Sequence, residues 1–538
     1  MKYRARLLAL TAGASLMLGT VPAGSTQPAD TPANAAAPTR PNIIFILVDD
    51  LPIDNFGIDN GALKTPNVDR LVREGTYVPR AAVGTSLCSP SRATILTGMS
   101  TRNHGIVDNQ KSSEEGLTYF PSYLQQAGYQ TAYFGKWHMG AESDEPRPGF
   151  DKWISFKGQG SYLPRGDFGQ NRPETLNVDG KVVKRKGYIT DELTDYQIDW
   201  LANGRDKSKP FFLYMSHKAV HGPCIAPPRY AKLYDGVETM SLPESFANTP
   251  ENTKGKPMWV INQRNSWHGI DIRHASGPES LLKEKRDCDA VLTGVDDSVG
   301  RTMKFLRDNK LDKNTIVVFF SDNGSMWGAH GLVDKRNAYE ESVRVPMIAW
   351  GPGIAKGRRS DALIRNLDLA PTFLAMAGAA APEQFEGQNV LPLLTGKTAW
   401  NDWPKDDFVY EYYWEWAYPM TPTTFSIVHD GYKYIQYHGI WDRDELYNLT
   451  NDPKEMNNLI DDPSLAERRA DLRKRLYGRL ASSEGDHRIP YSERENRGFV
   501  FRNAKGTPPA DMPDEWKLEP PARGDFDFYP LNNRALEK

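Results

Sequence analysis

The chain has 538 residues, of which 39% are hydrophobic and 25% charged, and its formal net charge is −3. This is the composition of a globular protein long enough for two or three domains, and it excludes disordered and collagen-like classes. Because 66 Lys and Arg nearly balance 69 Asp and Glu, no basic field indicates a nucleic-acid partner. The three cysteines, at positions 88, 224 and 288, are too few for a disulfide-stapled scaffold or a zinc ribbon.

The N-terminus has the pattern of an export signal. Lys2, Arg4 and Arg6 precede an apolar stretch over residues 7–18, and small residues follow near Ala23. This order predicts a signal peptide over 1–23, followed by a Pro/Ala/Thr-rich disordered lead-in over 24–39. The apolar stretch is too short to span a bilayer, and no later run approaches that length. We therefore expect an exported protein, periplasmic or secreted, without a membrane span.

From Arg40 to about residue 400, short apolar runs alternate with helical patterns. This alternation predicts an α/β fold, in which a large domain over 40–400 holds a mixed, mostly parallel sheet flanked by helices. One helix is indicated between Ser280 and Asn309, where apolar residues recur at helical spacing.

The pattern changes after residue 400. Strands are predicted near 408–414, 425–428 and 432–436, and the last two flank a hairpin turn at His429-Asp430-Gly431. With a helix near 464–482, residues 401–490 form a smaller C-terminal α+β subdomain with an antiparallel sheet. The tail over 491–538 receives no structural assignment.

Four strand-like runs of the large domain end in polar residues. The run 42–48 precedes Asp49-Asp50, and the run 315–320 precedes Ser321-Asp322-Asn323. The run 130–134 precedes Gly135-Lys136-Trp137-His138, and the run 211–215 precedes Ser216-His217 and then His221. Since ligands of open α/β sheets bind beyond the carboxyl ends of strands, we expect these residues to meet at one edge. Capping of the following loops is the alternative for any single one of them.

The acidic residues at these ends favour a hard cation. Asp49, Asp50, Asp322 and Asn323 supply oxygen ligands and no thiolate, which suits Ca²⁺, or Mg²⁺, better than zinc or copper. Carboxylates gathered at one edge would also repel one another without a neutralising cation.

The segment around Cys88 carries the most specific pattern. Ser89 and Pro90 are typical of an N-cap and a first helical position, and Gly98 of a helix end. We therefore expect Cys88 just before a helix N-terminus, where free N–H groups favour an anion. Arg92, one turn into the helix, can hold an oxyanion or a carboxylate.

The string Cys88-Ser-Pro-Ser-Arg92, continuing into Leu96-Thr97-Gly98, resembles the signature of the formylglycine-dependent sulfatases. These enzymes have an alkaline-phosphatase-like fold, and their signature cysteine is oxidised to formylglycine by a maturation enzyme. Gly135-Lys136-Trp-His138, Asp322-Asn323-Gly324 and Asp444-Glu-Leu-Tyr447 extend the resemblance over most of the chain.

The resemblance implies a role for each matching residue. Asp49, Asp50, Asp322 and Asn323 are similar to the ligands of the family's divalent ion, usually calcium, and residue 88 completes that set. Arg92 and Lys136 resemble the residues that hold the formylglycine hydrate, His138 the base that deprotonates it, and His221 the acid for the leaving alcohol. Lys335 resembles the sulfate-binding lysine. Val220 departs from the family pattern, which has proline before this histidine.

The residue types suit the chemistry of a sulfate ester. A cation together with Arg92, Lys136 and Lys335 can stabilise the negative charge that develops on the leaving oxygen. A hydrated aldehyde has two hydroxyl groups, of which one attacks sulfur and the other, once deprotonated, expels sulfate. Two histidines can serve as the acid and the base of this cycle.

Several residues near these motifs have two interpretations. His104, His217 and His330 are interpreted as substrate-binding residues, with turn or loop histidines as the alternative. Trp267, His268 and His274 are interpreted as surface residues, with a substrate loop as the alternative, and Asp296-Asp297 as a solvated helix face. The aromatic strand, with Tyr412, Tyr413, Trp414 and Trp416, is interpreted as sheet core rather than as a sugar-stacking surface. Whether Cys224 and Cys288 pair in an oxidising compartment stays open.

The sequence thus predicts an exported sulfatase that acts on a sulfated carbohydrate, most similar to bacterial polysaccharide sulfatases and N-acetylglucosamine-6-sulfatase-like enzymes. Two rivals remain: a formylglycine-dependent phosphonate monoester or phosphodiester hydrolase, and a non-catalytic glycan-binding relative. A cysteine-dependent phosphatase is disfavoured because its arginine lies further from the cysteine than Arg92 does.

Overall fold

A computed structural model describes residues 40–481, apart from 111–113, 141–142, 172–173, 405–406, 416, 439 and 441. The proposed signal peptide, the lead-in, the tail and Trp416 lie outside the described residues. No helix in the described part of the chain is long and apolar enough to cross a membrane.

The large domain is built on an 11-stranded sheet with the order β10-β2-β9-β8-β1-β7-β3-β4-β5-β6, and β11 also pairs with β2. The strands are β1 (Asn42–Val48), β2 (Thr76–Ala82), β3 (Gln130–Lys136), β4 (Lys152–Phe156), β5 (Thr175–Val178), β6 (Lys181–Lys184), β7 (Phe211–Ser216), β8 (Thr315–Ser321), β9 (Arg344–Trp350), β10 (Arg358–Arg359) and β11 (Ile364–Arg365).

The four strands with polar ends are neighbours in this sheet. In the order β8-β1-β7-β3 they run parallel, and β1 pairs with β7 on one side and with β8 on the other. Their carboxyl ends therefore lie at one edge. The predicted mixed, mostly parallel sheet and the convergence of the four ends are both confirmed.

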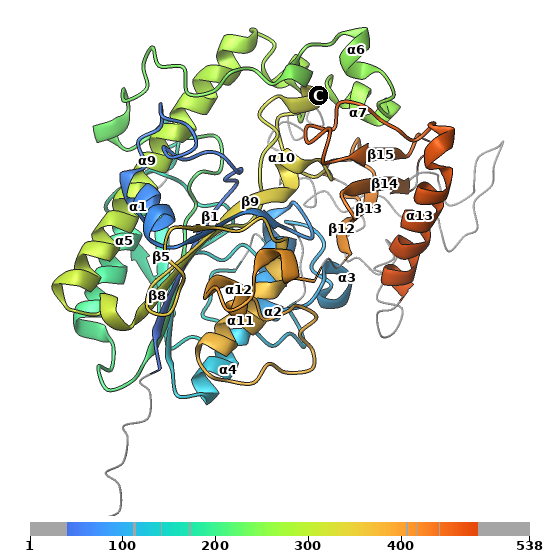
Figure 1. The fold of residues 1–538 in the computed structure, drawn as a ribbon. Coiled ribbons are helices and arrows are strands. Elements are labelled where there is room, and N and C mark those ends of the chain that lie inside the picture. The colour runs from blue at the N-terminus through green and yellow to red at the C-terminus, as the bar shows by residue number, and fades with distance from the viewer. Residues whose placement is uncertain are drawn as a thin grey trace, which may run out of the picture. The chain divides into compact units, whose positions relative to one another are not determined.

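Helices cover both faces of the sheet (Figure 1). On one face lie α1 (Pro66–Glu74), α5 (Ile189–Asp199) and α9 (Pro278–Asp308), and on the other lie α2 (Cys88–Thr97), α4 (Phe120–Gln126) and α11 (Leu369–Met376). Strand β1 contributes side chains to the core on both faces of the sheet. Phe45 packs with α11 on one face, and Ile46 belongs to the cluster with α1 and α9 on the other. A strand buried on both faces must be apolar throughout, which explains why residues 42–48 form an almost continuous apolar run.

The C-terminal subdomain has the predicted antiparallel sheet. Its strands β12 (Phe408–Tyr412), β13 (Thr423–His429), β14 (Tyr432–His438) and β15 (Glu445–Asn448) pair in sequence order, and α13 (Ala466–Ala481) packs against β13. The hairpin turn has positive φ at Asp430 and Gly431, which is the backbone that a two-residue turn between antiparallel strands requires. Tyr412 and Tyr413 are buried, so their interpretation as core residues is confirmed.

Asp296 differs from the sequence-based interpretation. It is only 2% exposed, and its carboxylate accepts the backbone N–H groups of Asn67 and Val68 at 2.9 and 2.8 Å, in the first turn of α1. It is therefore a buried cap for the N-terminus of a neighbouring helix. Asp297, the next residue, faces outward and pairs with Arg229. The prediction of a solvated pair was wrong for Asp296 because only the tertiary structure brings α1 to α9.

Candidate active site

The acidic residues at the ends of β1 and β8 lie in contact. The backbone N–H of Asp50 donates to Asp322 Oδ1 at 3.1 Å, and Asn323 Nδ2 donates to Asp50 Oδ1 at 2.6 Å. Asp49 and Asp322 are fully buried. The ligand atoms of Asp49, Asp50 and Cys88 lie within 4.8 Å of one another, so the structure brings the predicted metal ligands together.

Three cations from separate elements surround these carboxylates. Arg92 of α2 donates to Asp322 Oδ2 from Nε at 2.9 Å, and its Nη1 donates to the carbonyl of Lys136 and to Ser216 Oγ. Lys136, at the end of β3, forms an ion pair with Asp49. Lys335, from the loop before α10 (Glu340–Val343), bonds both carboxylate oxygens of Asp50 at 2.5 and 2.6 Å.

The pKa values of the three carboxyl groups differ because burial and neighbouring charges compete. Burial alone raises the pKa of Asp49, but Lys136, His221, Arg92 and Lys335 together hold it well below its usual range. Burial raises the pKa of Asp50 despite Lys335. Burial and the charge of Asp49 raise the pKa of Asp322 to about 7. Full ionisation of this acidic group thus requires more positive charge than the three side chains supply.

The donor set fits a hard divalent cation. Asp49, Asp50, Asp322 and Asn323 offer carboxylate and amide oxygens, and Asn323 Oδ1 is buried with no hydrogen-bond partner among the described residues. Such an orphaned acceptor beside three carboxylates is what a cation would satisfy. The residues present therefore fit the ion that the sequence predicts.

Position 88 differs in one respect from its prediction. The helix α2 begins at Cys88 itself, with Leu87 in the N-cap position, and it ends at Thr97 before Gly98 as expected. Ser89 is thus inside the first turn, where its backbone N–H donates to Asn109 Oδ1 at 2.9 Å and its hydroxyl donates to the carbonyl of His138. The Ser-Pro capping signal was overridden because these tertiary partners satisfy the first turn instead.

The environment of Cys88 disfavours a thiolate. The side chain is fully buried, and burial raises its pKa to about 12, although Lys136 and Lys335 lie nearby. A neutral thiol is a poor nucleophile. Burial therefore opposes the formation of a thiolate at this position.

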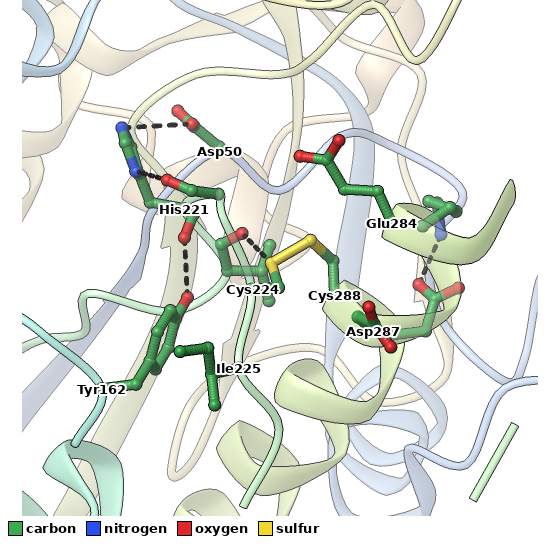
Figure 2. The surroundings of a disulfide bond; sticks show 12 residues. Asp50, Tyr162, His221, Cys224, Ile225, Glu284, Asp287 and Cys288 are labelled. Atoms are coloured by element: carbon green, nitrogen blue, oxygen red, sulfur yellow. Dashed lines mark hydrogen bonds and ion pairs between the residues drawn. A yellow bond between two sulfur atoms is a disulfide. The ribbon is translucent and has the colours of Figure 1, made fainter. Parts of the chain in front are cut away.

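The two predicted catalytic histidines lie at the same centre. His221 Nδ1 faces the carbonyl of Gly222 at 2.6 Å, and its Nε2 lies 3.7 Å from Asp50 Oδ2. Figure 2 shows that Tyr162 holds this segment as well, because its hydroxyl donates to the carbonyl of His221 at 2.8 Å. Burial lowers the pKa of both His221 and His138 well below the usual value, with Lys335 or Lys136 adding to the effect.

A disulfide joins Cys224 to Cys288 of α9, with their Cα atoms 5.0 Å apart (Figure 2). The structure thus supplies the pairing that the sequence left open. Cys224 lies three residues after His221, so the bond ties the histidine-bearing segment to the long helix.

A cavity of about 400 Å³ opens at this centre. His138, His221 and Lys335 line it, together with residues that sequence reasoning did not assign to the site: Asn109, Gln110, Gln159, Trp267, His268, Arg273, Asp334, Arg336 and Tyr418. Most of these residues lie in loops without periodicity. For Trp267 and His268 the polar stretch allowed a substrate loop, but the surface interpretation was preferred. Asp334 and Arg336 flank Lys335 in the sequence, and this adjacency was a further hint.

The surface interpretation of the 267–274 segment was wrong in part. Trp267 is exposed as predicted, but it lines the cavity, as does His268 next to it in the sequence. His268 and His274 are both buried. The polar composition of this segment gave no sign of its packing, because its partners lie in other elements: His268 packs against Tyr418 and Asp334, and His274 bonds Ser280 of α9.

The three weaker histidine candidates do not line this cavity. His104 bonds Thr94 Oγ1 through Nε2 and accepts the N–H of Ile106 at Nδ1, both at 3.0 Å, so it joins α2 to α3 (Thr101–His104). His330 stacks on Tyr339 and lines a separate small cavity. His217 is buried, and among the described residues neither ring nitrogen has a hydrogen-bond partner. We do not include these residues in the substrate cavity.

Comparison with known proteins agrees with this fold and centre. The sulfatase family profile matches residues 41–379, more than half of the chain, and a profile described as N-sulphoglucosamine sulphohydrolase, C-terminal, matches residues 328–481. The protein therefore belongs to the sulfatase family and is a sulfuric ester hydrolase.

The most similar relatives include enzymes named for a sulfated sugar. An N-acetylglucosamine-6-O-sulfatase of Bacteroides thetaiotaomicron is 34% identical over 487 residues, which cover 80% of this chain and 85% of that protein. The N-acetylglucosamine-6-sulfatase of Homo sapiens is 30% identical and covers 80% and 83%. A solved structure in complex with its substrate, D-glucosamine-2-N,6-O-disulfate, has a TM-score of 0.73 and 29% identity, over 82% of this chain and 98% of that one.

Proposed function

We propose that this sulfatase removes sulfate from a sulfated carbohydrate, through a formylglycine hydrate at position 88 and one divalent cation, Ca²⁺ or Mg²⁺. The observation that carries the proposal is the juxtaposition of position 88 with the acidic group and the three cations, of which Lys335 also lines a cavity together with His138 and His221. The similarity to N-acetylglucosamine-6-sulfatases supports a 6-sulfated amino sugar as the first substrate to test.

The contacts of the residues indicate which would bind the cation, which would supply the nucleophile and which would stabilise charge. Asp49, Asp50, Asp322 and Asn323 would hold the cation, which supplies fixed positive charge beside the reacting sulfate. A formylglycine hydrate, made from Cys88 by a maturation enzyme, supplies an oxygen nucleophile that the buried thiol cannot. Arg92 is held in place by Asp322 and the carbonyl of Lys136, so its charge is fixed before substrate enters.

His221 is positioned to act at the leaving oxygen. Because the Nδ1–H donates to the carbonyl of Gly222, Nε2 is the ring nitrogen left for the substrate. The neutral ring carries no proton at Nε2, so His221 would act as the acid only as the imidazolium, which the negative charge of the bound ester would favour. Lys335 lines the same cavity and would stabilise the negative charge on that oxygen. His138 lies on the cavity wall, and its Nδ1 is buried without a hydrogen-bond partner among the described residues. It would serve as the base at position 88.

Export is part of the proposal. The disulfide between Cys224 and Cys288 suits an oxidising compartment. The signal-like N-terminus supports the same location, periplasmic or secreted. Large glycans are met outside the cytoplasm, which agrees with the substrate class.

Two measurements test the proposal. Mass spectrometry of the peptide containing residue 88, from protein made in its own host, should find an aldehyde or its hydrate. Hydrolysis should then be compared for 6-O-sulfated N-acetylglucosamine, D-glucosamine-2-N,6-O-disulfate and an aryl phosphonate ester. Preferential release of sulfate supports the proposal, whereas faster phosphonate hydrolysis would favour the rival activity. An unmodified thiol with sugar binding but no turnover would favour a glycan-binding protein.

A further inference from the structure

Trp267 is an exposed aromatic residue at the mouth of the active-site cavity. Its side chain is 59% exposed, and it lines the cavity together with His221 and Lys335. A tryptophan usually buries most of its large apolar surface. An indole left in solvent beside a catalytic cavity suggests contact with a ligand rather than a role in the core.

The backbone around Trp267 is fixed relative to Lys335. Gly269 forms a β-bridge with Leu332, and the N–H of Val333 donates to the carbonyl of His268 at 2.9 Å. A side chain at Gly269 would have its Cβ 2.2 Å from a backbone carbonyl oxygen of Arg264, so this tight approach requires glycine. The indole is therefore presented from a segment that is hydrogen-bonded to the loop carrying Lys335, and its place at the cavity does not depend on a free loop.

The neighbours of Trp267 already have protein partners. His268 stacks on Tyr418 with 4.3 Å between ring centroids, and the guanidinium of Arg336 lies 3.8 Å from the centroid of Tyr418 on the same wall. Within the described residues, no aromatic pair or cation–π contact involves Trp267. Its ring is thus the aromatic surface of this wall that is left for a ligand.

From these observations we infer that Trp267 is a carbohydrate-stacking platform, on which the apolar face of the sulfated pyranose lies while its sulfate ester points towards Lys335 and His221. The inference rests on the proposed function and deepens it. A pyranose presents a face of C–H groups that packs on an aromatic ring, while its hydroxyls remain available for hydrogen bonds. Lys335 and His221 supply the polar end of the same cavity. A sulfated sugar therefore matches the cavity in both parts, with its sulfate at the polar end and its C–H face on Trp267.

The test measures binding separately from turnover. Affinity for 6-O-sulfated N-acetylglucosamine and D-glucosamine-2-N,6-O-disulfate is measured by calorimetry in a Cys88→Ala background, which cannot turn over. Trp267→Ala is compared with Trp267→Phe, which keeps an aromatic face. Trp400→Ala is the matched control, because Trp400 is 44% exposed and lines a different cavity. The same three substitutions are then assayed for KM and kcat in the matured enzyme.

We expect Trp267→Ala to weaken sugar binding about tenfold and to raise KM by a similar factor, with kcat little changed. Trp267→Phe should retain most of the affinity, and Trp400→Ala all of it. Unchanged sugar affinity in Trp267→Ala would overturn the inference and leave the proposed function intact. If the parent protein neither binds nor hydrolyses either sugar, the proposed function fails first, and the inference fails with it.

Discussion

Breaking the disulfide between Cys224 and Cys288 should lower the stability of the protein by a predictable amount. The two cysteines are 64 residues apart in sequence. Closing a loop of that length removes chain entropy from the unfolded state worth about 4 kcal/mol at 25 °C. Unfolding entropy of about 2.1 cal/mol/K per residue, over roughly 440 ordered residues, converts this into a fall of about 4 °C in the unfolding temperature.

The assay is thermal unfolding of the wild type, with and without a reductant, beside a Cys224→Ala/Cys288→Ala variant. Cys88 is the one other cysteine in the chain, and it is buried. Reductant should therefore destabilise the wild type and leave the double variant unchanged. A double variant that unfolds at the wild-type temperature would refute the loop-closure reasoning.

The same bond should affect catalysis through His221. Cys224 Sγ lies 3.1 Å from the carbonyl oxygen of Val220, and Tyr162 holds the carbonyl of His221 from the other side (Figure 2). Loosening the segment should misplace Nε2 of His221 and slow sulfate esters of basic alcohols more than activated aryl sulfates. An equal loss with both substrates would mean that the disulfide acts on stability alone.

Three further predictions follow from the structure. Cation binding should release protons, because the pKa of Asp322 is raised to about 7 and a ligand must be deprotonated; affinity for Ca²⁺ should therefore be weaker at pH 5.5 than at pH 7.5, and calorimetry in buffers of different ionisation enthalpy measures the release. His221→Ala should slow hydrolysis of a sulfated sugar more than that of an activated aryl sulfate, and equal slowing would contradict the acid role. Asp296→Ala should cost about 2 kcal/mol of unfolding free energy, because the N-terminus of α1 loses its buried acceptor, with kcat unchanged; denaturant titration and an activity assay check the two halves.

The sequence predicted best what short-range patterns determine. The run 42–48 matches β1 residue for residue, because a strand buried on both faces is apolar throughout and its end is marked by Asp49 and Asp50. The motif around Cys88 likewise located α2 to within a residue or two. The hairpin at His429-Asp430-Gly431 was predictable because a two-residue turn has a strong local signature.

What could not be predicted depends on contacts between distant segments. From the pattern of its own helix, Asp296 is predicted to be solvated. It is a buried cap because α1 packs against that helix and the N-terminal N–H groups of α1 donate to the Asp296 carboxylate. Trp267 and His268 lie in a polar stretch without periodicity, and a bridge to Leu332 brings them to the active site. Ser89 is a strong capping residue by composition, but Asn109 and His138 bind it from elsewhere in the fold.

The charge balance of the centre ties the fold to its chemistry. Asp49, Asp50 and Asp322 are opposed by Arg92, Lys136 and Lys335 through direct ion pairs, and the three side-chain cations balance the three carboxylates once all three are ionised. A divalent cation in the same group would leave an excess of positive charge in a buried setting, where charge acts strongly. A sulfate monoester carries one negative charge and gains more on its leaving oxygen during cleavage. The excess positive charge would thus stabilise the transition state of ester cleavage more than the bound ester. The three side-chain cations would keep the acidic ligands in place.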